Sequence, residues 1–269
     1  MDSCCVGMDM IISDIFGNSF SSESDPRRII SLVPSTTETL YDLGLGDRVV
    51  GVTRFCVHPS TAREEKILVG GTKNIAADRI QSCQADLVIG NQEENSEQIY
   101  TQLQLLNIPT CFFFPKTVNQ AILDIEKLSR LFHRSEEYKF WFQKCQANRV
   151  QCTEKSFRFV YLIWRKPWMS VNGDCFISSM LREIGGENIF ADHPERYFSC
   201  TLEEIKREKP DVLLLSSEPF PFQEKHKQEL LAEGFGEKQI RLINGELCSW
   251  HGTRMAKAFL YLNDWVAEL

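Results

Sequence analysis

The sequence contains the same short pattern twice, once in each half: an acidic helix followed by a mainly apolar strand. In the first half, residues 78–80 (Asp-Arg-Ile) precede the strand pattern at 84–90. In the second half, residues 203–205 (Glu-Glu-Ile) precede the corresponding pattern at 209–215. A short, continuously apolar run indicates a strand that is buried on both faces of a sheet. The repeat therefore predicts two α/β lobes of similar plan, with a cleft between them.

Short apolar segments alternate with helical patterns through both halves of the chain. We expect strands at 28–33, 49–52, 86–89 and 110–114 in the first half, and at 157–163, 211–215 and 239–243 in the second. Helical patterns in the second half cover 176–184, 202–208, 223–233 and 254–266. This alternation predicts an α/β fold in which both lobes have mainly parallel sheets with right-handed crossovers.

The segment between the two halves has no glycine and no proline from residue 117 to residue 154. Apolar residues at helical spacing predict one helix at 118–131, and a second helix is expected from Ser135 to about residue 154. A helix of about 20 residues is ~30 Å long, enough to join two lobes as a single backbone helix. The expected organisation is a polar tail at 1–26, a first lobe at 27–116, connecting helices at 117–155 and a second lobe at 156–269.

The composition indicates which cellular compartment and which kinds of partner to expect. A net charge of -7 and a pI near 5.4 argue against nucleic acid and anionic membranes, which need clustered Lys and Arg. The ten cysteines contain no Cys-x-x-Cys pair, which favours buried thiols over disulfides or a metal site. No basic region opens the chain, and no stretch approaches the ~20 apolar residues of a membrane span. We therefore expect a cytoplasmic monomer that binds a small molecule.

Residues 28–38 (RIISLVPSTTE), residues 44–53 (GLGDRVVGVT) and the two acidic helix–strand modules together resemble a known family. They are similar to the helical-backbone substrate-binding proteins of ABC importers, which are receptors for cobalamin, haem and ferric siderophores. The resemblance extends from about residue 27 to residue 265 and is specific to the fold rather than to the ligand. It implies a binding protein, not an enzyme, that holds a corrinoid, tetrapyrrole or chelated-metal ligand between its lobes.

The end of the first strand is the first candidate for a ligand contact. Pro34 ends that strand, Ser35 is placed to cap the following helix, and Glu38 is spaced to complete a capping box with Ser35. The start of this helix then lies at the carboxyl edge of the sheet, where open α/β sheets bind ligands. The alternative interpretation is a helix start with no contact to a ligand.

Three loops near strand ends carry cations, aromatic rings and imidazoles. The predicted ligand-binding residues of these loops are Arg54, Phe55 and His58, then Trp164, Arg165 and Trp168, and finally Trp250, His251 and Arg254. Aromatic rings suit a flat ligand face, and arginines suit carboxylates or phosphates. We expect these residues to converge on the cleft, whereas the alternative places the tryptophans in the core.

Two further interpretations depend on histidine and cysteine. His58 and His251, with Cys56 or Cys248, are candidate ligands of a metal, although a lone histidine is more often structural. Whether a metal is bound stays open, and a corrinoid or a haem-like molecule is the expected cofactor. An enzyme with one of these cysteines as nucleophile and a histidine as base is the alternative function, either a hydrolase or a transferase. No GxSxG, P-loop or GxGxxG pattern supports this alternative, so binding is favoured.

The resemblance also implies a protein partner. In the family, one carboxylate per lobe docks onto the permease, and Asp78 and Glu203 occupy the matching positions here. Asp78 replaces the usual glutamate, and no export signal precedes the first strand, so an ABC permease is only one of the expected partners. The alternative is that both acids are helix first-turn residues favoured by the helix dipole. Residues 71–73 (Gly-Thr-Lys) also lack the aromatic ring that is common in cobalamin receptors.

Overall fold

The computed structural model describes residues 11–149 and 156–269, which form two compact units. Unit 1 contains the described residues up to Pro115, together with Gln120–Lys144 and Gly252–Arg254. Unit 2 contains Lys116–Asn119, the described part of Cys145–His251, and Met255–Leu269. Each unit is built around its own sheet, so the prediction of two α/β lobes is confirmed.

The sheet of unit 1 is entirely parallel. Its five strands lie in the order β5-β4-β3-β6-β7, so the chain starts in the middle of the sheet and extends it in both directions. The strand bounds are β3 (Ile29–Ser31), β4 (Val49–Val52), β5 (Ile67–Leu68), β6 (Leu87–Asn91) and β7 (Thr110–Phe113). The central strands β3 and β6 are fully buried, as their continuous apolar sequences predict.

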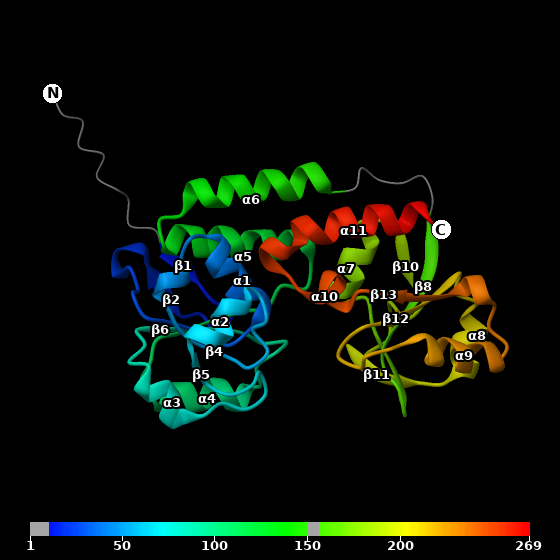
Figure 1. Cartoon of the computed structure of the whole chain (residues 1–269), viewed down its shortest axis with the longest axis horizontal. Helices are drawn as coiled ribbons and strands as arrows, with labels where there is room; N and C mark the ends of the chain where they lie inside the picture. Colours follow the sequence, from blue (N-terminus) through cyan, green and yellow to red (C-terminus); the bar gives the residue numbers. More distant parts are fainter. Residues whose placement is uncertain (1–10, 150–155) are drawn as a thin grey trace. The chain divides into compact units, whose positions relative to one another are not determined.

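Helices cover both faces of this sheet. In Figure 1, α3 and α4 lie below the strands of unit 1, and α1 and α5 lie above them. Ile80 of α3 and Leu103 of α4 pack with Ile30, Val88 and Phe112 of the strands in one apolar core. The bounds are α1 (Pro34–Asp42), η2 (Gly46–Arg48), α2 (Ser60–Glu65), α3 (Ala77–Ser82), α4 (Glu97–Leu105) and α5 (Val118–Leu131).

A short hairpin precedes the first strand of the sheet, where the sequence predicts a polar tail. Strands β1 (Ile11–Ser13) and β2 (Ser19–Ser21) pair antiparallel, and η1 (Ser22–Ser24) follows them. The buried Asp14 carboxylate accepts hydrogen bonds from the backbone N–H groups of Phe16, Asn18 and Phe112, at 2.9, 2.8 and 3.1 Å. Because Phe112 belongs to the edge strand β7, Asp14 attaches the hairpin to the sheet. Residues 1–10 lie outside the described part of the chain.

The sheet of unit 2 combines parallel and antiparallel strands. Its order is β11-β9-β8-β12-β13, and β10 pairs with the first half of β8. Strands β8, β10, β12 and β13 are parallel, whereas β9 and β11 extend the sheet in antiparallel fashion. The bounds are β8 (Phe157–Trp164), β9 (Trp168–Val171), β10 (Gly186–Asn188), β11 (Tyr197–Cys200), β12 (Val212–Ser216) and β13 (Ile240–Ile243).

The helices of unit 2 also cover both faces of its sheet. Ile205 of α8 and Leu230 of α9 pack with Val160, Leu213 and Ile240 of the strands. Figure 1 shows α8 and α9 on one side of this sheet, with α7, α10 and α11 on the other. The bounds are α7 (Phe176–Arg182), α8 (Leu202–Glu208), α9 (Glu224–Ala232), η3 (Glu237–Gln239), α10 (Gly245–Ser249) and α11 (Met255–Ala267). Between α10 and α11, the short η4 (Gly252–Arg254) belongs to unit 1.

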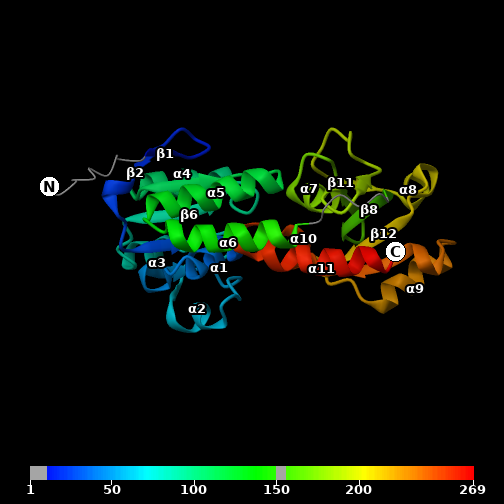
Figure 2. The ribbon, with the colours of Figure 1, turned by 90° about the horizontal axis from the view of Figure 1, so that it is seen from above.

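Two helices connect the halves of the sequence. Helix α5 and helix α6 (Ser135–Asn148) lie side by side, as Figures 1 and 2 both show. The boundary between the units falls inside both of these helices, and the chain crosses it again on either side of η4. The sequence predicts one connecting helix that extends to about residue 154. Helix α6 ends at Asn148, and residues 150–155 lie outside the described part of the chain.

Candidate functional site

In unit 1, Arg54 and Phe55 form an exposed pair at the carboxyl end of β4. The Arg54 guanidinium lies 5.0 Å from the centre of the Phe55 ring, and the Phe55 side chain is 46% exposed. Both side chains rest on Gly71, where an added Cβ would lie 3.2 Å from Phe55 Cε2 and 3.3 Å from Arg54 Nη2. The cation therefore lies over the face of the ring, and both side chains pack against the backbone at Gly71. His58 lies half-buried in the same loop.

The start of α1 differs from the predicted capping box. Helix α1 begins at Pro34 with Val33 as its N-cap, and no side chain caps it. Ser35 is buried inside the first turn, so the prediction that Glu38 caps Ser35 is wrong. Glu38 instead accepts a hydrogen bond from Arg254, with 2.6 Å between Oε2 and Nε, and both side chains are only 7% exposed.

In unit 2, Trp164 and Trp168 lie on either side of a tight turn between β8 and β9. The sequence predicts a loop here, and the structure shows a hairpin whose turn contains Lys166 in the left-handed region at φ 62°. Trp164 is 41% exposed and meets the edge of Phe220, with 5.6 Å between the ring centres. Trp168 stacks on the buried Phe222 at 5.9 Å, so it is partly a core residue.

The Arg165 side chain is largely buried and forms an ion pair with Glu229. Its Nε donates to Glu229 Oε2 at 2.6 Å, its Nη2 contacts the other carboxylate oxygen, and its side chain is 18% exposed. Glu229 is a residue of α9, so this bidentate ion pair fastens the β8–β9 turn to that helix. The positive charge of Arg165 is thereby balanced before any ligand arrives.

Trp250 and His251 follow α10 and differ in their surroundings. Trp250 is half-buried, and its Nε1 donates to Glu218 Oε1 at 2.8 Å. His251 meets the edge of Phe176, with 6.1 Å between the ring centres. Desolvation lowers the pKa of the His251 imidazole to about 4, so the ring is neutral at physiological pH.

The cysteines proposed as nucleophiles are buried. Cys56 Sγ lies 3.0 Å from Thr37 Oγ1 and 3.3 Å from Thr53 Oγ1, and Cys248 is fully enclosed. Burial raises the pKa of the Cys56 thiol and raises that of Cys248 to about 12. Because the thiolate is the reactive form, neither residue is suited to nucleophilic chemistry. Among residues 11–149 and 156–269, no three His, Cys, Asp or Glu side chains gather as a metal site would require.

The structure thus groups the predicted residues unit by unit. Arg54, Phe55 and His58 share one loop of unit 1, and Trp164 lies in unit 2 at the carboxyl edge of the sheet. That the two groups line a single cleft stays a prediction. Glu218 and Phe220 were not among the predicted site residues, although both lie in the segment that follows β12. The signal was the run 217–222 (Ser-Glu-Pro-Phe-Pro-Phe), in which aromatic residues follow a buried strand.

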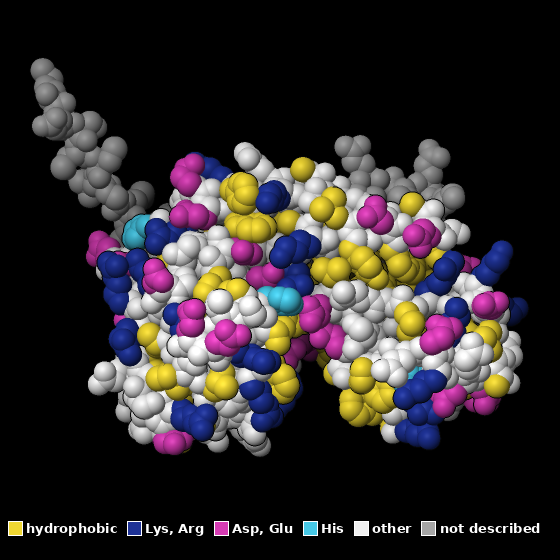
Figure 3. Space-filling view, in the orientation of Figure 1, with side chains coloured by type: hydrophobic (Ala, Val, Ile, Leu, Met, Phe, Trp, Pro, Cys, Tyr) yellow, Lys and Arg dark blue, Asp and Glu magenta, His cyan; other side chains and the backbone are white. Residues whose placement is uncertain are grey.

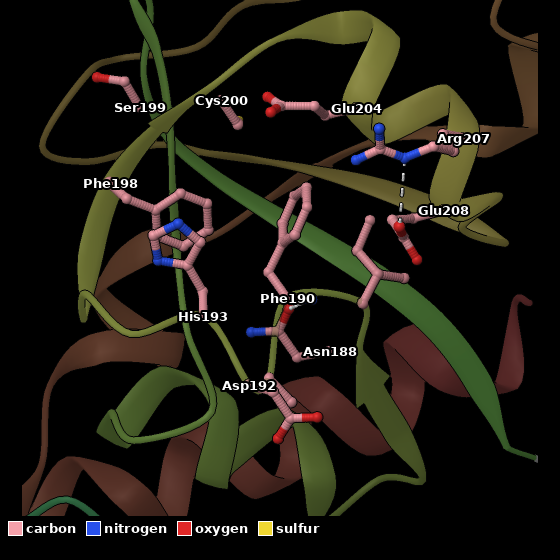
Figure 4. Close-up of a pocket in the computed structure, with 12 residues that line it drawn as sticks. Asn188, Phe190, Asp192, His193, Phe198, Ser199, Cys200, Glu204, Arg207 and Glu208 are labelled. Atoms are coloured by element: carbon pink, nitrogen blue, oxygen red, sulfur yellow. Dashed lines mark hydrogen bonds and ion pairs between the residues drawn. The ribbon is translucent and has the colours of Figure 1, made fainter.

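A separate hollow of about 330 Å³ in unit 2 contains none of the predicted ligand-binding residues. Figure 4 shows its walls, which come from the segment after β10, from β11 and from α8. His193 stacks on Phe198 with 3.5 Å between the ring centres, and its Nδ1 accepts from the Glu195 N–H. Glu204 caps α8 through Thr201. These polar groups therefore already have partners within the protein.

The exposed surface carries charges of both signs. Figure 3 shows Lys and Arg interspersed with Asp and Glu on this face, which fits the small net negative charge. Within the described residues, none of the helices has the length and apolar character needed to span a bilayer.

The two predicted docking acids lie in equivalent places in their units. Asp78 is in the first turn of α3, Glu203 is in the first turn of α8, and both are exposed. Each helix precedes a central strand of its sheet, β6 in unit 1 and β12 in unit 2. The repeated module in the sequence is therefore a repeated structural unit, with one exposed carboxylate in each copy.

Two α/β units with mainly parallel sheets, each with aromatic residues at strand ends, define a two-lobed binding protein. The profile of the periplasmic binding protein family matches residues 29–234. The chain therefore belongs to the periplasmic binding protein family, a family of binding proteins rather than enzymes. It is 30% identical over 222 residues to the vitamin B12-binding protein of Vibrio campbellii (strain ATCC BAA-1116), covering 80% of this chain and 78% of that protein.

Solved structures share the fold. The periplasmic vitamin B12-binding protein BtuF of Vibrio cholerae superposes with a TM-score of 0.75 at 22% identity, over 91% of this chain and 98% of that one. The periplasmic haem-binding protein HutB of Vibrio cholerae gives a TM-score of 0.73 at 18% identity, over 89% and 98% of the two chains. The family resemblance and the α/β fold predicted from the sequence are thus confirmed.

Proposed function

We propose that this protein binds a corrinoid of the cobalamin type. The proposal depends on which of the three arginines predicted to contact the ligand already form an ion pair within the protein. Arg165 and Arg254 are each paired with a carboxylate, Glu229 and Glu38 respectively. Among the described residues, Arg54 is the one of the three that forms no ion pair with a carboxylate, and it lies on Phe55.

This charge balance favours a ligand with few negative groups. A haem carries two propionates, and ferric siderophores are often polyanionic, so both need several cations that are not already paired. A corrinoid instead presents a ring fringed by neutral amides, with a single phosphate. The exposed rings of Phe55 and Trp164 supply apolar contact area, and Arg54 supplies one cation. The vitamin B12-binding relative from Vibrio campbellii supports the same ligand class.

Calorimetric titration with cyanocobalamin tests this function. We expect saturable 1:1 binding by the wild type, and Trp164→Ala to weaken it by about 1–3 kcal/mol, the scale of a buried aromatic anchor. Trp265→Ala is the matched control, because Trp265 packs on Phe157 from α11, away from these strand ends. No binding by the wild type, or equal losses in the two variants, would contradict the proposal.

For an exported form of the protein, we propose that Asp78 and Glu203 dock onto an ABC permease. The support is their exposure at matching positions of the two units and the family resemblance. Reversing both charges, with Asp78→Lys and Glu203→Lys, should abolish co-purification with such a permease while cyanocobalamin binding is retained. Undiminished co-purification would exclude this docking role.

We propose a cytoplasmic location as the alternative to permease docking, because the receptor of an importer meets its permease outside the cytoplasm. Its support is the cysteine content: the seven described cysteines are all buried free thiols. The protein isolated from its own cells and denatured under a thiol-blocking reagent should then show ten free thiols. A lower count, with disulfides found by mass spectrometry, would instead indicate an oxidising compartment.

A further inference from the structure

We infer that Glu218 is the positioning residue that fixes the Trp250 indole for contact with the ligand. This inference rests on the proposed function, and Glu218 is not one of the residues predicted from the sequence to bind the ligand. Glu218 lies two positions after the end of β12, and Trp250 is the C-cap residue that follows α10. The two residues therefore come from separate segments of unit 2.

The Glu218 carboxylate joins these elements through one oxygen. Its Oε1 accepts a hydrogen bond from Trp250 Nε1 at 2.8 Å and another from Ser249 Oγ at 2.7 Å. Hydrogen bonds to an ionised acceptor are stronger than those between neutral groups. The indole N–H has one direction, so this bond restricts the rotation of the half-buried ring.

The backbone of Glu218 is itself held in place. Ser216 Oγ donates to the Glu218 carbonyl oxygen at 2.6 Å, so the Tyr161 hydroxyl, 2.9 Å from the same Oγ, is the donor to Ser216. On the other side, Gly245 leaves room for the side chain, since an added Cβ there would lie 2.5 Å from Glu218 Cγ. Glu218 is therefore a fixed acceptor that holds the indole ring through the bond to Nε1.

Because Glu218 is bonded to the Trp250 N–H, substitutions can distinguish two roles for Glu218: holding the indole ring, or contacting the ligand directly. If Glu218 acts by holding the ring, a neutral acceptor of the same shape keeps most of its effect, and removing the indole N–H makes Glu218 dispensable. If Glu218 were instead a direct charged contact, Glu218→Gln would be as damaging as Glu218→Ala, and the effect would persist without the indole N–H.

The test is a double-mutant cycle read out as affinity for cyanocobalamin. We expect Glu218→Ala to weaken binding about tenfold or more, and Glu218→Gln to weaken it less than about threefold. The double variant Glu218→Ala/Trp250→Phe should bind as Trp250→Phe alone does. Glu224→Ala is the control, because this α9 carboxylate has a 63% exposed side chain and should leave binding unchanged. Unchanged affinity in Glu218→Ala, or additive losses in the double variant, would overturn the inference.

A second measurement needs no ligand. In the ligand-free protein with 15N-labelled tryptophan, the Trp250 indole N–H should exchange with solvent several-fold faster in Glu218→Ala than in the wild type, because it loses its acceptor. If the wild type fails to bind cyanocobalamin, the proposed function fails, and the exchange rate alone then decides the inference. An exchange rate unaffected by Glu218→Ala would overturn it, and a faster rate would support it.

Discussion

Substitution of Arg254 tests whether this residue is structural or contacts the ligand. The Arg254–Glu38 ion pair has 2.6 Å between Nε and Oε2, and both side chains are 7% exposed. Arg254→Met keeps the apolar stem and removes the guanidinium, which leaves a buried carboxylate without its ion-pair partner. Breaking one side of a buried pair typically costs about 3–5 kcal/mol, so we expect a loss of this size in the free energy of unfolding.

Urea unfolding followed by circular dichroism measures this loss, and two controls define its origin. Arg130→Ala removes a cation that is 51% exposed and paired with Glu126, so it should change stability by less than about 1 kcal/mol. Arg254→Met/Glu38→Leu replaces both charges and should recover much of the loss, because an apolar pair carries no desolvation penalty. Wild-type stability in Arg254→Met together with lost cyanocobalamin binding would refute the structural role and restore the ligand contact predicted from the sequence.

Three further experiments, two substitutions and one labelling measurement, probe other buried groups. Burial raises the pKa of Asp124 to about 6, so the folded state binds this proton more tightly than the unfolded chain does, and the contribution of Asp124 to stability should fall as the pH rises from 3.8 towards 6. Asp124→Asn should reduce that slope in urea melts recorded across this range, and an unaltered slope would contradict it. Asp14→Ala should cost about 2–4 kcal/mol and speed hydrogen exchange at Phe112 N–H, because this N–H loses its acceptor and the hairpin loses one of its hydrogen bonds to the edge strand; unchanged protection would contradict this role of Asp14. Cys56 and Cys248 should react with a thiol reagent far more slowly in the native protein than in urea, and fast native labelling of either would disprove their burial.

The strands that carry the site were predictable because short stretches of neighbouring residues are enough to specify them. The buried runs that became β3, β6, β8 and β12 are short, apolar and bounded by helical patterns, and each was predicted to within two residues. The repeated acidic helix before β6 and β12 revealed the internal similarity of the two lobes without any knowledge of their packing.

The missed elements lack such local signals. Strands β9 and β11 have mixed polar and apolar residues, and the turn before β9 places Lys166, not glycine, in the left-handed region. The hairpin β1–β2 has only three residues per strand and depends on the distant contact between Asp14 and Phe112. Local pattern alone favours a loop or a tail in both places.

Side-chain partners were the least predictable part of the site. Glu38 and Arg254 are 216 positions apart, and Glu218 and Trp250 are 32 positions apart. A capping box was the better local explanation for Glu38, but the buried guanidinium offered a stronger interaction in the folded chain. The sequence therefore showed which residue types lie at the strand ends. It did not show which of their charges form ion pairs with distant residues of the same protein.

Native mass spectrometry under competition tests the central claim most directly. The purified protein would be incubated with equal concentrations of cyanocobalamin, haemin and a ferric catecholate siderophore, which is polyanionic, and the retained ligand would be identified from the mass of the complex. Because two of the three candidate arginines are already paired with carboxylates, we expect a 1:1 complex with the corrinoid as the dominant species. A dominant complex with haemin or with the siderophore, or no complex at all, would contradict it.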